Sequence, residues 1–301
     1  MNTRARLLSA ADPRGLAALG VHEADRPLVG AWLRAVADDP DDLAAVGRLI
    51  ETVLAPGLGD FDGLRGGAAF PPEAARHRLA DGVLPLAALA AFAPEVRAFH
   101  LARGVPSEIA GQTLHDLGEQ VAKHRRVTGR PGLGNQNWLR GAWSGGLLWI
   151  GRLQFELALS NLGADGDPVR VLSVHIPATG PLRSADVDAA LAAAAPVFAQ
   201  CYVDAGAPAA VTCHSWLLDR TLLDLVPGSN LAAFCARWEV WERSVCDRDA
   251  YYFGFDIEPP AGVRLPYDLD RLPDDTRLHR AMIAHWRAGG HFTTCTGRLR
   301  S

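Results

Sequence analysis

The chain has 301 residues, of which 49% are hydrophobic and 21% are charged, and this composition is enough for one or two globular cores. Its net charge of −4 provides no basic surface of the kind that binds nucleic acid or an anionic membrane, so we expect neither as a partner. The five cysteines are odd in number and contain no C-x-x-C pair, which argues against a disulfide framework or a zinc site and favours the reducing cytoplasm.

The apolar stretches of the N-terminal half are those of a soluble protein. The first one lacks a signal-peptide core, because Asp12 and Pro13 interrupt it soon after Leu8, and no export is expected. The most apolar internal stretch, Val83 to Phe92, contains Pro85 and is much shorter than the roughly 20 residues needed to span a bilayer. We therefore expect it to form a core helix.

The pattern from Pro27 to about Arg126 is helical. Between Asp41 and Leu54, apolar residues recur at spacings near 3.6, which predicts an amphipathic helix. Asp39 is placed to cap this helix, and Pro40 suits its first turn.

A further helix is predicted from Ser107 to Arg126, with apolar residues along one stripe, and Gly129 and Pro131 should end it. The stretch from Pro56 to Pro72 is rich in glycine and proline and is predicted to be a long loop.

The period changes in the second half of the chain. Arg152 to Leu157 alternates polar and apolar residues as a strand does, and Val169 to Ile176 follows a turn at Gly163 to Pro168, which suggests an antiparallel hairpin. A helix from Ser184 to about Gln200 then precedes a short strand from Ala209 to His214. This βαβ unit should have a right-handed crossover, which makes its two strands parallel.

Two histidines are predicted at the carboxyl ends of these parallel strands. His175 and His214 each end a strand, and ligands of α/β sheets generally bind at this edge. A histidine there can take a proton from an amine, directly or through water, so both are candidates for a general base. The alternative is that each ring only bonds a loop carbonyl.

Cys213 and Ser215 flank His214 and offer two possible nucleophiles. Neighbours along a strand point to opposite faces, so adjacency alone does not make a catalytic dyad. Ser215 could donate a proton to a leaving thiolate, or it could cap a following helix at Leu217 to Val226. Cys213 is better explained as a small buried residue.

A polar strand face carries Arg152, Gln154 and Glu156, and such a face is either solvated or lines a cleft. In a cleft, Glu156 could orient the acceptor or act as a base through water. The C-terminal histidines lie six residues apart and cannot share one helix face, so we expect no metal site among them; they are His279, His285 and His291.

Several motifs in the C-terminal half resemble a bacterial family of acyltransferase-domain proteins, which have a helical N-acyltransferase N-terminal domain and a GNAT-like C-terminal domain. The matching runs are Gly129-Arg130-Pro131-Gly132-Leu133, Trp138-Leu139, Gly151-Arg152-Leu153-Gln154-Phe155-Glu156, Val174-His175-Ile176-Pro177, Gly180-Pro181-Leu182, Cys213-His214-Ser215-Trp216-Leu217-Leu218 and Ala288-Gly289-Gly290-His291.

The resemblance implies an α+β fold in which a helical domain at residues 1–127 packs on a GNAT-like mixed-sheet domain at residues 128–301. Acyl-CoA would lie between the two parallel strands. The residues expected to hold it are Val174, His175, Ile176, Gly180, Leu182, Arg183 and Ser184.

One feature of ordinary GNAT enzymes is missing from this sequence. They hold the pyrophosphate with a Gln/Arg-x-x-Gly-x-Gly/Ala loop at a helix N-terminus. Here residues 177 to 184 have one glycine and one arginine, Gly180 and Arg183, and the next helix opens with Asp186 and Asp188, whose charges oppose a phosphate. Acyl-CoA remains the expected donor, and a carrier-bound or aminoacyl donor stays open.

The predicted function is transfer of an acyl group from acyl-CoA to the amine of a small acceptor. The expected catalytic residues are His214, Ser215, His175 and Glu156, with a backbone N–H near Val174 to Ile176 stabilising the oxyanion. The alternative is a GNAT-like protein that binds a small molecule or a partner without catalysis. No metal cofactor is expected, and a homodimer is compatible with the sequence.

Overall fold

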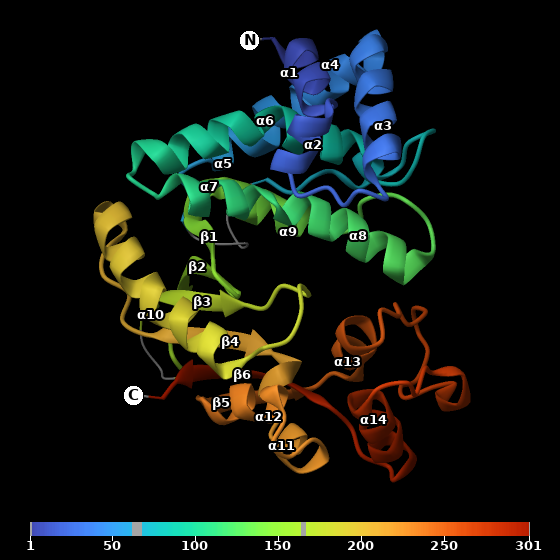
Figure 1. The fold of residues 1–301 in the computed structure, drawn as a ribbon, viewed down its shortest axis with the longest axis vertical. Coiled ribbons are helices and arrows are strands. Elements are labelled where there is room, and N and C mark those ends of the chain that lie inside the picture. Colours follow the sequence, from blue (N-terminus) through green and yellow to red (C-terminus); the bar gives the residue numbers. More distant parts are fainter. Residues whose placement is uncertain (1, 62–67, 164–166, 301) are drawn as a thin grey trace. The chain divides into compact units, whose positions relative to one another are not determined.

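The computed structural model describes residues 2–61, 68–163 and 167–300. The chain divides into two compact units (Figure 1). The first comprises Met1–Ile150, Gln154–Ala158 and Ala194–Gly206, and the second comprises Gly151–Leu153, Leu159–Ala193 and Ala207–Ser301.

Helices make up most of the first unit. Within the described residues the first strand is β1 (Leu147–Ile150), so the N-terminal part is helical, as predicted. The α-helices before β1 are α1 (Thr3–Ala10), α2 (Pro13–Ala18), α3 (Arg26–Asp38), α4 (Pro40–Leu49), α5 (Ala55–Gly57), α6 (Val83–Ala102), α7 (Ser107–Leu114), α8 (Asp116–Thr128) and α9 (Gln136–Gly141).

Two helix ends are confirmed at the residues predicted for them, the start after Asp39 and the end at Gly129. The carboxylate of Asp39 accepts the N–H groups of Asp41 and Asp42 at 3.0 and 3.1 Å, at the start of α4. Gly129 adopts φ +68° after α8 and donates its N–H to a carbonyl of the last turn. The end of the predicted Asp41 to Leu54 helix differs, because its last five residues form a π-helix.

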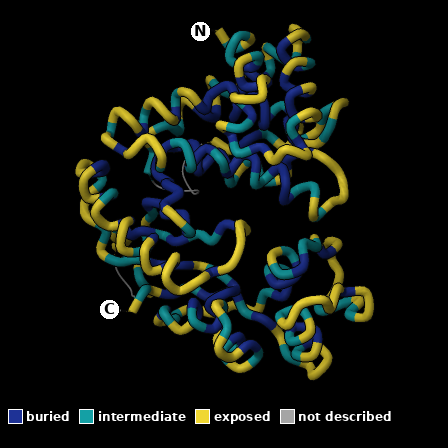
Figure 2. Tube along the Cα trace, in the orientation of Figure 1, coloured by how far each residue is buried: buried dark blue, intermediate teal, exposed yellow. Residues whose placement is uncertain are grey.

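The apolar helix α6 is the centre of the first core. By length and composition it could cross a membrane, but 67% of its most apolar window is buried inside the protein. Leu86, Leu89 and Val96 are each at most 1% exposed. Figure 2 colours the whole chain by burial class. Its apolar character is therefore used in a protein core, as predicted for Val83 to Phe92.

The prediction of one helix from Ser107 to Arg126 was wrong. The chain forms two helices, α7 and α8, that meet at His115. The N–H of Gly118, which a continuous helix would direct to Leu114, instead donates to the carbonyl of Leu19 at 3.0 Å. The Leu19 segment lies so close that a Cβ on Gly118 would come within 2.0 Å of the Gly20 carbonyl oxygen.

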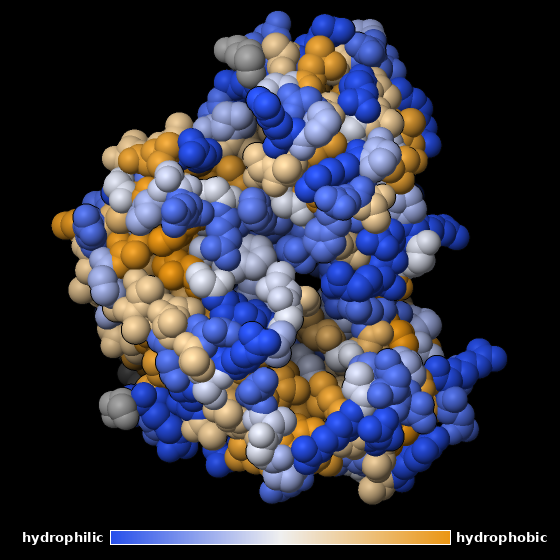
Figure 3. Space-filling model, in the orientation of Figure 1, coloured by the Kyte–Doolittle hydropathy of each residue, from blue (hydrophilic) through white to orange (hydrophobic). Residues whose placement is uncertain are grey.

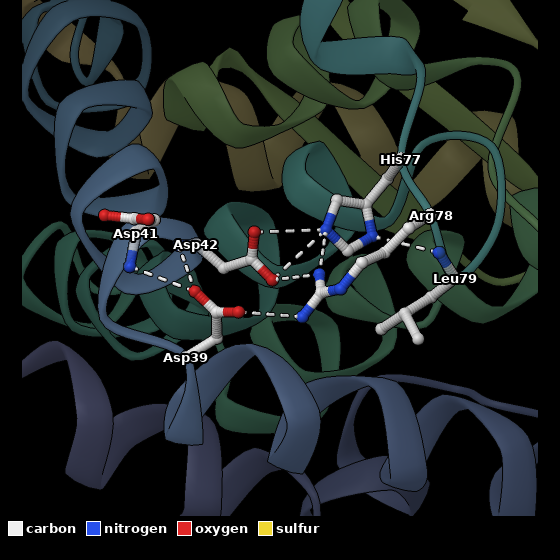
Figure 4. Close-up of polar contacts among 6 residues, drawn as sticks. All are labelled: Asp39, Asp41, Asp42, His77, Arg78 and Leu79. Carbon is white, nitrogen blue, oxygen red and sulfur yellow. Dashed lines mark hydrogen bonds and ion pairs between the residues drawn. The ribbon is translucent and has the colours of Figure 1, made fainter.

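An ion-pair cluster ties the segment before α6 to the start of α4 (Figure 4). The guanidinium of Arg78 donates to Asp42 at 2.6 Å and to Asp39 at 2.9 Å, and His77 Nε2 lies 3.1 Å from both oxygens of Asp42. Burial raises the pKa of Asp42, but the hydrogen bonds from Arg78 and His77 outweigh this and hold it below its usual value.

The six strands of the sheet lie in the order β1-β2-β3-β4-β6-β5. The elements after β1 are β2 (Leu153–Ser160), β3 (Val169–His175), α10 (Ser184–Cys201), β4 (Val211–Ser215), α11 (Thr221–Leu225), α12 (Asn230–Ala236), β5 (Trp238–Val245), α13 (Asp247–Gly254), α14 (Arg277–Arg287) and β6 (Thr293–Leu299). Strand β4 pairs with β3 in parallel and with β6 in antiparallel orientation.

The βαβ unit formed by β3, α10 and β4 was predicted, and its parallel pairing is confirmed. The helix predicted at Leu217 to Val226 is instead a 3₁₀ turn, Trp216–Leu218, followed by the short helix α11. Three strands were not predicted: β1, β5 and β6. The turn predicted at Gly163 to Pro168 falls partly on residues outside the described part of the chain.

The surface drawn in Figure 3 mixes hydrophilic and hydrophobic side chains. Among the described residues, the large hydrophobic side chains with the greatest exposure are Val203, Val245 and Phe253, at 76%, 67% and 58%. They stand on three separate elements of the chain.

Candidate active site

The parallel strands β3 and β4 stop pairing before β4 ends. Their register runs from Leu172 opposite Val211 to Val174 opposite Cys213. Strand β4 then continues through His214 to Ser215, paired with β6 alone. The parallel pairing thus ends at the carboxyl ends of the two strands, and this edge is where ligands of such sheets bind.

His214 is the first residue of β4 beyond the paired region, and it belongs to a relay across three neighbouring strands. Its Nδ1 lies 2.8 Å from Oγ1 of Thr296 on β6, and that hydroxyl donates to Oε2 of Glu242 on β5 at 3.0 Å. In the sheet, Thr296 lies directly opposite His214 on β4 and directly opposite Glu242 on β5.

The relay fixes the tautomer of His214. A carboxylate only accepts hydrogen bonds, so the proton of the Thr296 hydroxyl is directed at Glu242. The hydroxyl oxygen must then accept from Nδ1–H of His214, which leaves a lone pair on Nε2. The His214 side chain is exposed, so this lone pair is open to a substrate.

His175 lies next to His214 in the register. It follows the last paired residue of β3, as His214 follows the last paired residue of β4. Equivalent positions on parallel strands present their side chains to the same face, so both rings lie on one face of the sheet. His175 is half-buried and His214 exposed. The two histidines chosen from sequence are therefore brought together.

Ser215 and Cys213 have different surroundings. The hydroxyl oxygen of Ser215 accepts the N–H of Leu217 at 3.1 Å, which confirms the capping role as one of its two predicted uses. Cys213 is 1% exposed, and burial raises the pKa of its thiol. A buried thiol of this kind is a poor nucleophile, as the sequence had suggested.

The end of β3, the loop that follows it and the first residue of α10 carry the residues expected to hold the donor. Val174 and Leu182 are buried, and Ile176 is half-buried. Gly180, Arg183 and Ser184 are exposed, and Gly180 has φ +120°. The loop therefore presents a polar surface over buried apolar side chains.

The polar face predicted at Arg152, Gln154 and Glu156 is divided between the two units. Arg152 precedes β2 and belongs to the second unit with the histidines, whereas Gln154 and Glu156 belong to the first. Gln154 and Glu156 are 2% and 5% exposed, so for these two residues the solvated-face alternative does not hold.

Gln154 lies in a buried polar cluster of the first unit. The carboxylate of Asp116 accepts hydrogen bonds from Gln120 at 3.1 Å and from the indole of Trp138 at 2.7 Å. Burial raises the pKa of Asp116, and the hydrogen bonds from Gln120 and Trp138, with the Gln154 amide beside the carboxylate, counteract only part of this effect. Asp116 itself is 2% exposed.

An Asp–His pair at the same edge of the sheet was not predicted as a unit. Strand β6 begins beside the end of β4, and His291 stands two residues before it. The Nδ1 of His291 lies 2.6 Å from Asp247, whose buried carboxylate also accepts the indole N–H of Trp286 and the N–H of Phe292. The sequence analysis singled out the motif that ends in His291. Its partner Asp247 lies 44 residues away in the chain, so no local pattern predicts the pair.

The other C-terminal histidines have their own partners. His279 bonds Asp275 at 2.7 Å and the carbonyl of Gly254 at 2.9 Å, and His285 lies 3.3 Å from the carbonyl of His291. Among the residues that the structure describes, no group of three or more His, Cys, Asp or Glu side chains is placed to hold a metal ion.

Two families of known domains match the sequence in the same order as the two halves of the fold. Residues 13–145 match the N-acyltransferase N-terminal domain, and residues 147–299 match the GNAT-like C-terminal domain. The chain belongs to the acyltransferases that combine these two domains. The family assignment agrees with the resemblance found in the motifs and with the mixed sheet of the C-terminal half.

Solved acyltransferases of this fold resemble the chain over almost its whole length. One is an acyltransferase in complex with CoA and 10C-teicoplanin, and it is 32% identical, with a TM-score of 0.76. Another, in complex with decanoyl-CoA and teicoplanin, is 33% identical with the same TM-score. Each match covers 95% of this chain and 86% of the other. No curated protein matches the sequence significantly.

Proposed function

We propose that this GNAT-like N-acyltransferase transfers a medium-length acyl group from acyl-CoA to an amine of teicoplanin or a compound of the same kind. The observation that carries the proposal is the match over 95% of the chain to acyltransferases that bind decanoyl-CoA and teicoplanin. The position of His214 at the open edge of the parallel strands supports it.

In the proposed mechanism, the neutral amine attacks the thioester carbonyl, the C–N bond forms, and the C–S bond breaks. Nε2 of His214 accepts the proton that the amine loses, because the relay to Thr296 and Glu242 holds the proton of the ring on Nδ1. A backbone N–H near Val174 to Ile176 stabilises the oxyanion of the tetrahedral intermediate.

The leaving thiolate needs a proton, and we assign Ser215 to relay it: the hydroxyl donates to the sulfur while its oxygen regains, through water, the proton that His214 took from the amine. The N–H of Leu217 already donates to the Ser215 oxygen at 3.1 Å, so it stabilises that oxygen when the hydroxyl proton leaves. His175 shares the face of the sheet with His214 and is assigned to the donor side, next to the loop that starts at Ile176.

The test is to incubate the purified protein with decanoyl-CoA and teicoplanin and to measure both released thiol and the mass of the acceptor. We expect thiol release that depends on teicoplanin, with the acceptor gaining one decanoyl group. The His214→Ala variant should be slow, and the Cys213→Ala variant should stay active. Thermal stabilisation by decanoyl-CoA without any thiol release would instead support a non-catalytic binder.

The donor is tested separately by comparing decanoyl-CoA with S-decanoyl pantetheine and with a decanoylated carrier protein. We expect the highest kcat/KM for decanoyl-CoA. A carrier-protein thioester that reacts faster than decanoyl-CoA would contradict the proposed donor and leave the transfer reaction in place.

A further inference from the structure

The loop between β3 and α10 lacks the glycine-rich sequence that holds pyrophosphate in ordinary GNAT enzymes, and a single arginine organises it instead. Three carbonyl oxygens of the loop converge on the guanidinium of Arg152. Nε donates to Pro181 at 3.1 Å, Nη1 to Pro177 at 2.9 Å and Nη2 to Gly180 at 2.6 Å.

Arg152 is well placed to hold this arrangement. It lies in the tight turn between β1 and β2, directly after Gly151, which has φ +59°. A guanidinium presents its donors in a rigid planar fork, so three bonds to one loop fix the loop relative to the turn. Burial lowers the pKa of Arg152, although Asp186 opposes this, and an arginine remains charged at physiological pH.

The direction of the carbonyls determines where the N–H groups of the loop point. In a trans peptide, the C=O of one residue and the N–H of the next point in opposite directions. Because the carbonyls of Pro177 and Pro181 face Arg152, the N–H groups of Ala178 and Leu182 face the opposite side of the loop. The charged guanidinium also polarises both peptide groups, which strengthens these N–H groups as donors.

The acidic residues at the start of α10 are less repulsive to an anion than the sequence suggested. Asp188 forms an ion pair of 2.5 Å with Arg237, and Asp186 lies 4.0 Å from Arg183. The three groups that accept hydrogen bonds from Arg152 in the loop are neutral carbonyls. These bonds therefore leave the positive charge of the guanidinium without a carboxylate partner.

We infer that Arg152 replaces the glycine-rich phosphate loop as a positioning residue: it fixes the β3–α10 loop so that the N–H groups of Ala178 and Leu182 face the pyrophosphate of the donor. The inference rests on the proposed use of acyl-CoA. It explains how a member of this family can bind a pyrophosphate without the usual glycines.

The test compares the binding of CoA with that of pantetheine, which lacks the pyrophosphate, in matched variants. Arg152→Gln should weaken CoA binding about 10-fold or more, because the loop loses three charge-assisted hydrogen bonds, and should leave pantetheine binding within about 2-fold. Arg152→Lys should lose most of the same affinity, because an ammonium cannot bond three carbonyls at once. Arg271→Gln removes an equal charge from a side chain that is 85% exposed and lies outside the loop, and it should change CoA binding less than about 3-fold.

Hydrogen exchange of the loop and the steady-state constants provide independent readouts. In Arg152→Lys, the amides of residues 178–182 should exchange faster, and KM for the donor should rise while kcat at saturating donor stays near the wild-type value. Unchanged CoA affinity in a folded Arg152 variant would overturn the inference, as would an equal loss of CoA and pantetheine binding. If the wild-type protein itself fails to bind CoA, the proposed donor is wrong, which is a different result.

Discussion

Replacing Thr296 tests whether the relay to His214 operates in catalysis. Thr296→Val keeps the shape of the side chain and suits a strand, but removes the hydroxyl that accepts Nδ1–H of His214 and donates to Glu242. The Nδ1–H group of His214 then loses the acceptor that lies 2.8 Å away in the wild type, so the tautomer of the ring is no longer fixed. We expect turnover to fall while the fold is retained.

The size of the effect follows from the bond that is lost. A hydrogen bond between neutral groups contributes about 0.5–1.5 kcal/mol, and about 1.4 kcal/mol corresponds to tenfold in rate, so kcat should fall about 2- to 13-fold. His214→Ala removes the general base itself, which is typically worth about 10²- to 10⁴-fold. Thr296→Val should therefore lie well between the wild type and His214→Ala.

The assay is the initial rate of thiol release with decanoyl-CoA and teicoplanin, measured from neutral to alkaline pH. Thr296→Ser is the matched control, since it keeps the hydroxyl and should retain most of the activity. Higher pH should partly rescue His214→Ala, because more of the acceptor amine is already neutral. The reasoning would be refuted if Thr296→Ser lost as much activity as Thr296→Val, or if His214→Ala turned over at the wild-type rate.

Three further predictions concern buried and capping groups. Burial lowers the pKa of His100 from 6.5 to about 4, so the unfolded state binds a proton more readily than the folded state. The stability that is present above pH 6.5 is therefore lost as the pH falls toward 4, and the total loss is about 3 kcal/mol. Urea unfolding at several pH values should show this slope in the wild type and a flatter one in His100→Leu. Cys213→Ala should keep transfer activity within about 3-fold in the thiol-release assay, since its thiol is buried, at a stability cost of about 1 kcal/mol. Asp39→Ala should lower the free energy of unfolding by about 1 kcal/mol, because α4 loses its cap. Asp39→Asn keeps the cap and should lower this free energy less. If both variants lose the same amount, the ion pair with Arg78 and not the cap accounts for the stability.

Much of the local structure follows from short-range sequence signals. Asp39 before Pro40 places the start of α4, and Gly129 places the end of α8, because capping and a left-handed glycine act within one turn. The strand–helix–strand spacing from Val169 onward also predicts the parallel pair and puts His175 and His214 at one edge. These features depend on residues that are close together in the chain.

The strands β5 and β6 carry no such signal. A bulge between Val240 and Glu242 breaks the alternation of β5. On β6, Thr294, Thr296 and Arg298 form a polar face, and the opposite face has only Cys295 and Leu299 as apolar side chains around Gly297, which lowers the strand propensity. Their places in the sheet come from the pairing of β6 with β4 and of β5 with β6, and these are tertiary interactions.

What the sequence by itself determined is therefore the order of helices, the βαβ unit and the two histidines of the edge, through periodicity and capping that act over a few residues. Tertiary structure alone decided the environment of these groups. The relay joins His214 to Thr296 across 82 positions and Thr296 to Glu242 across 54, and the carbonyls of Pro177 and Pro181 reach Arg152 across 25 and 29. No local pattern encodes these contacts, because they form only when β6 pairs with both β4 and β5 and when the β3–α10 loop folds back on the turn before β2.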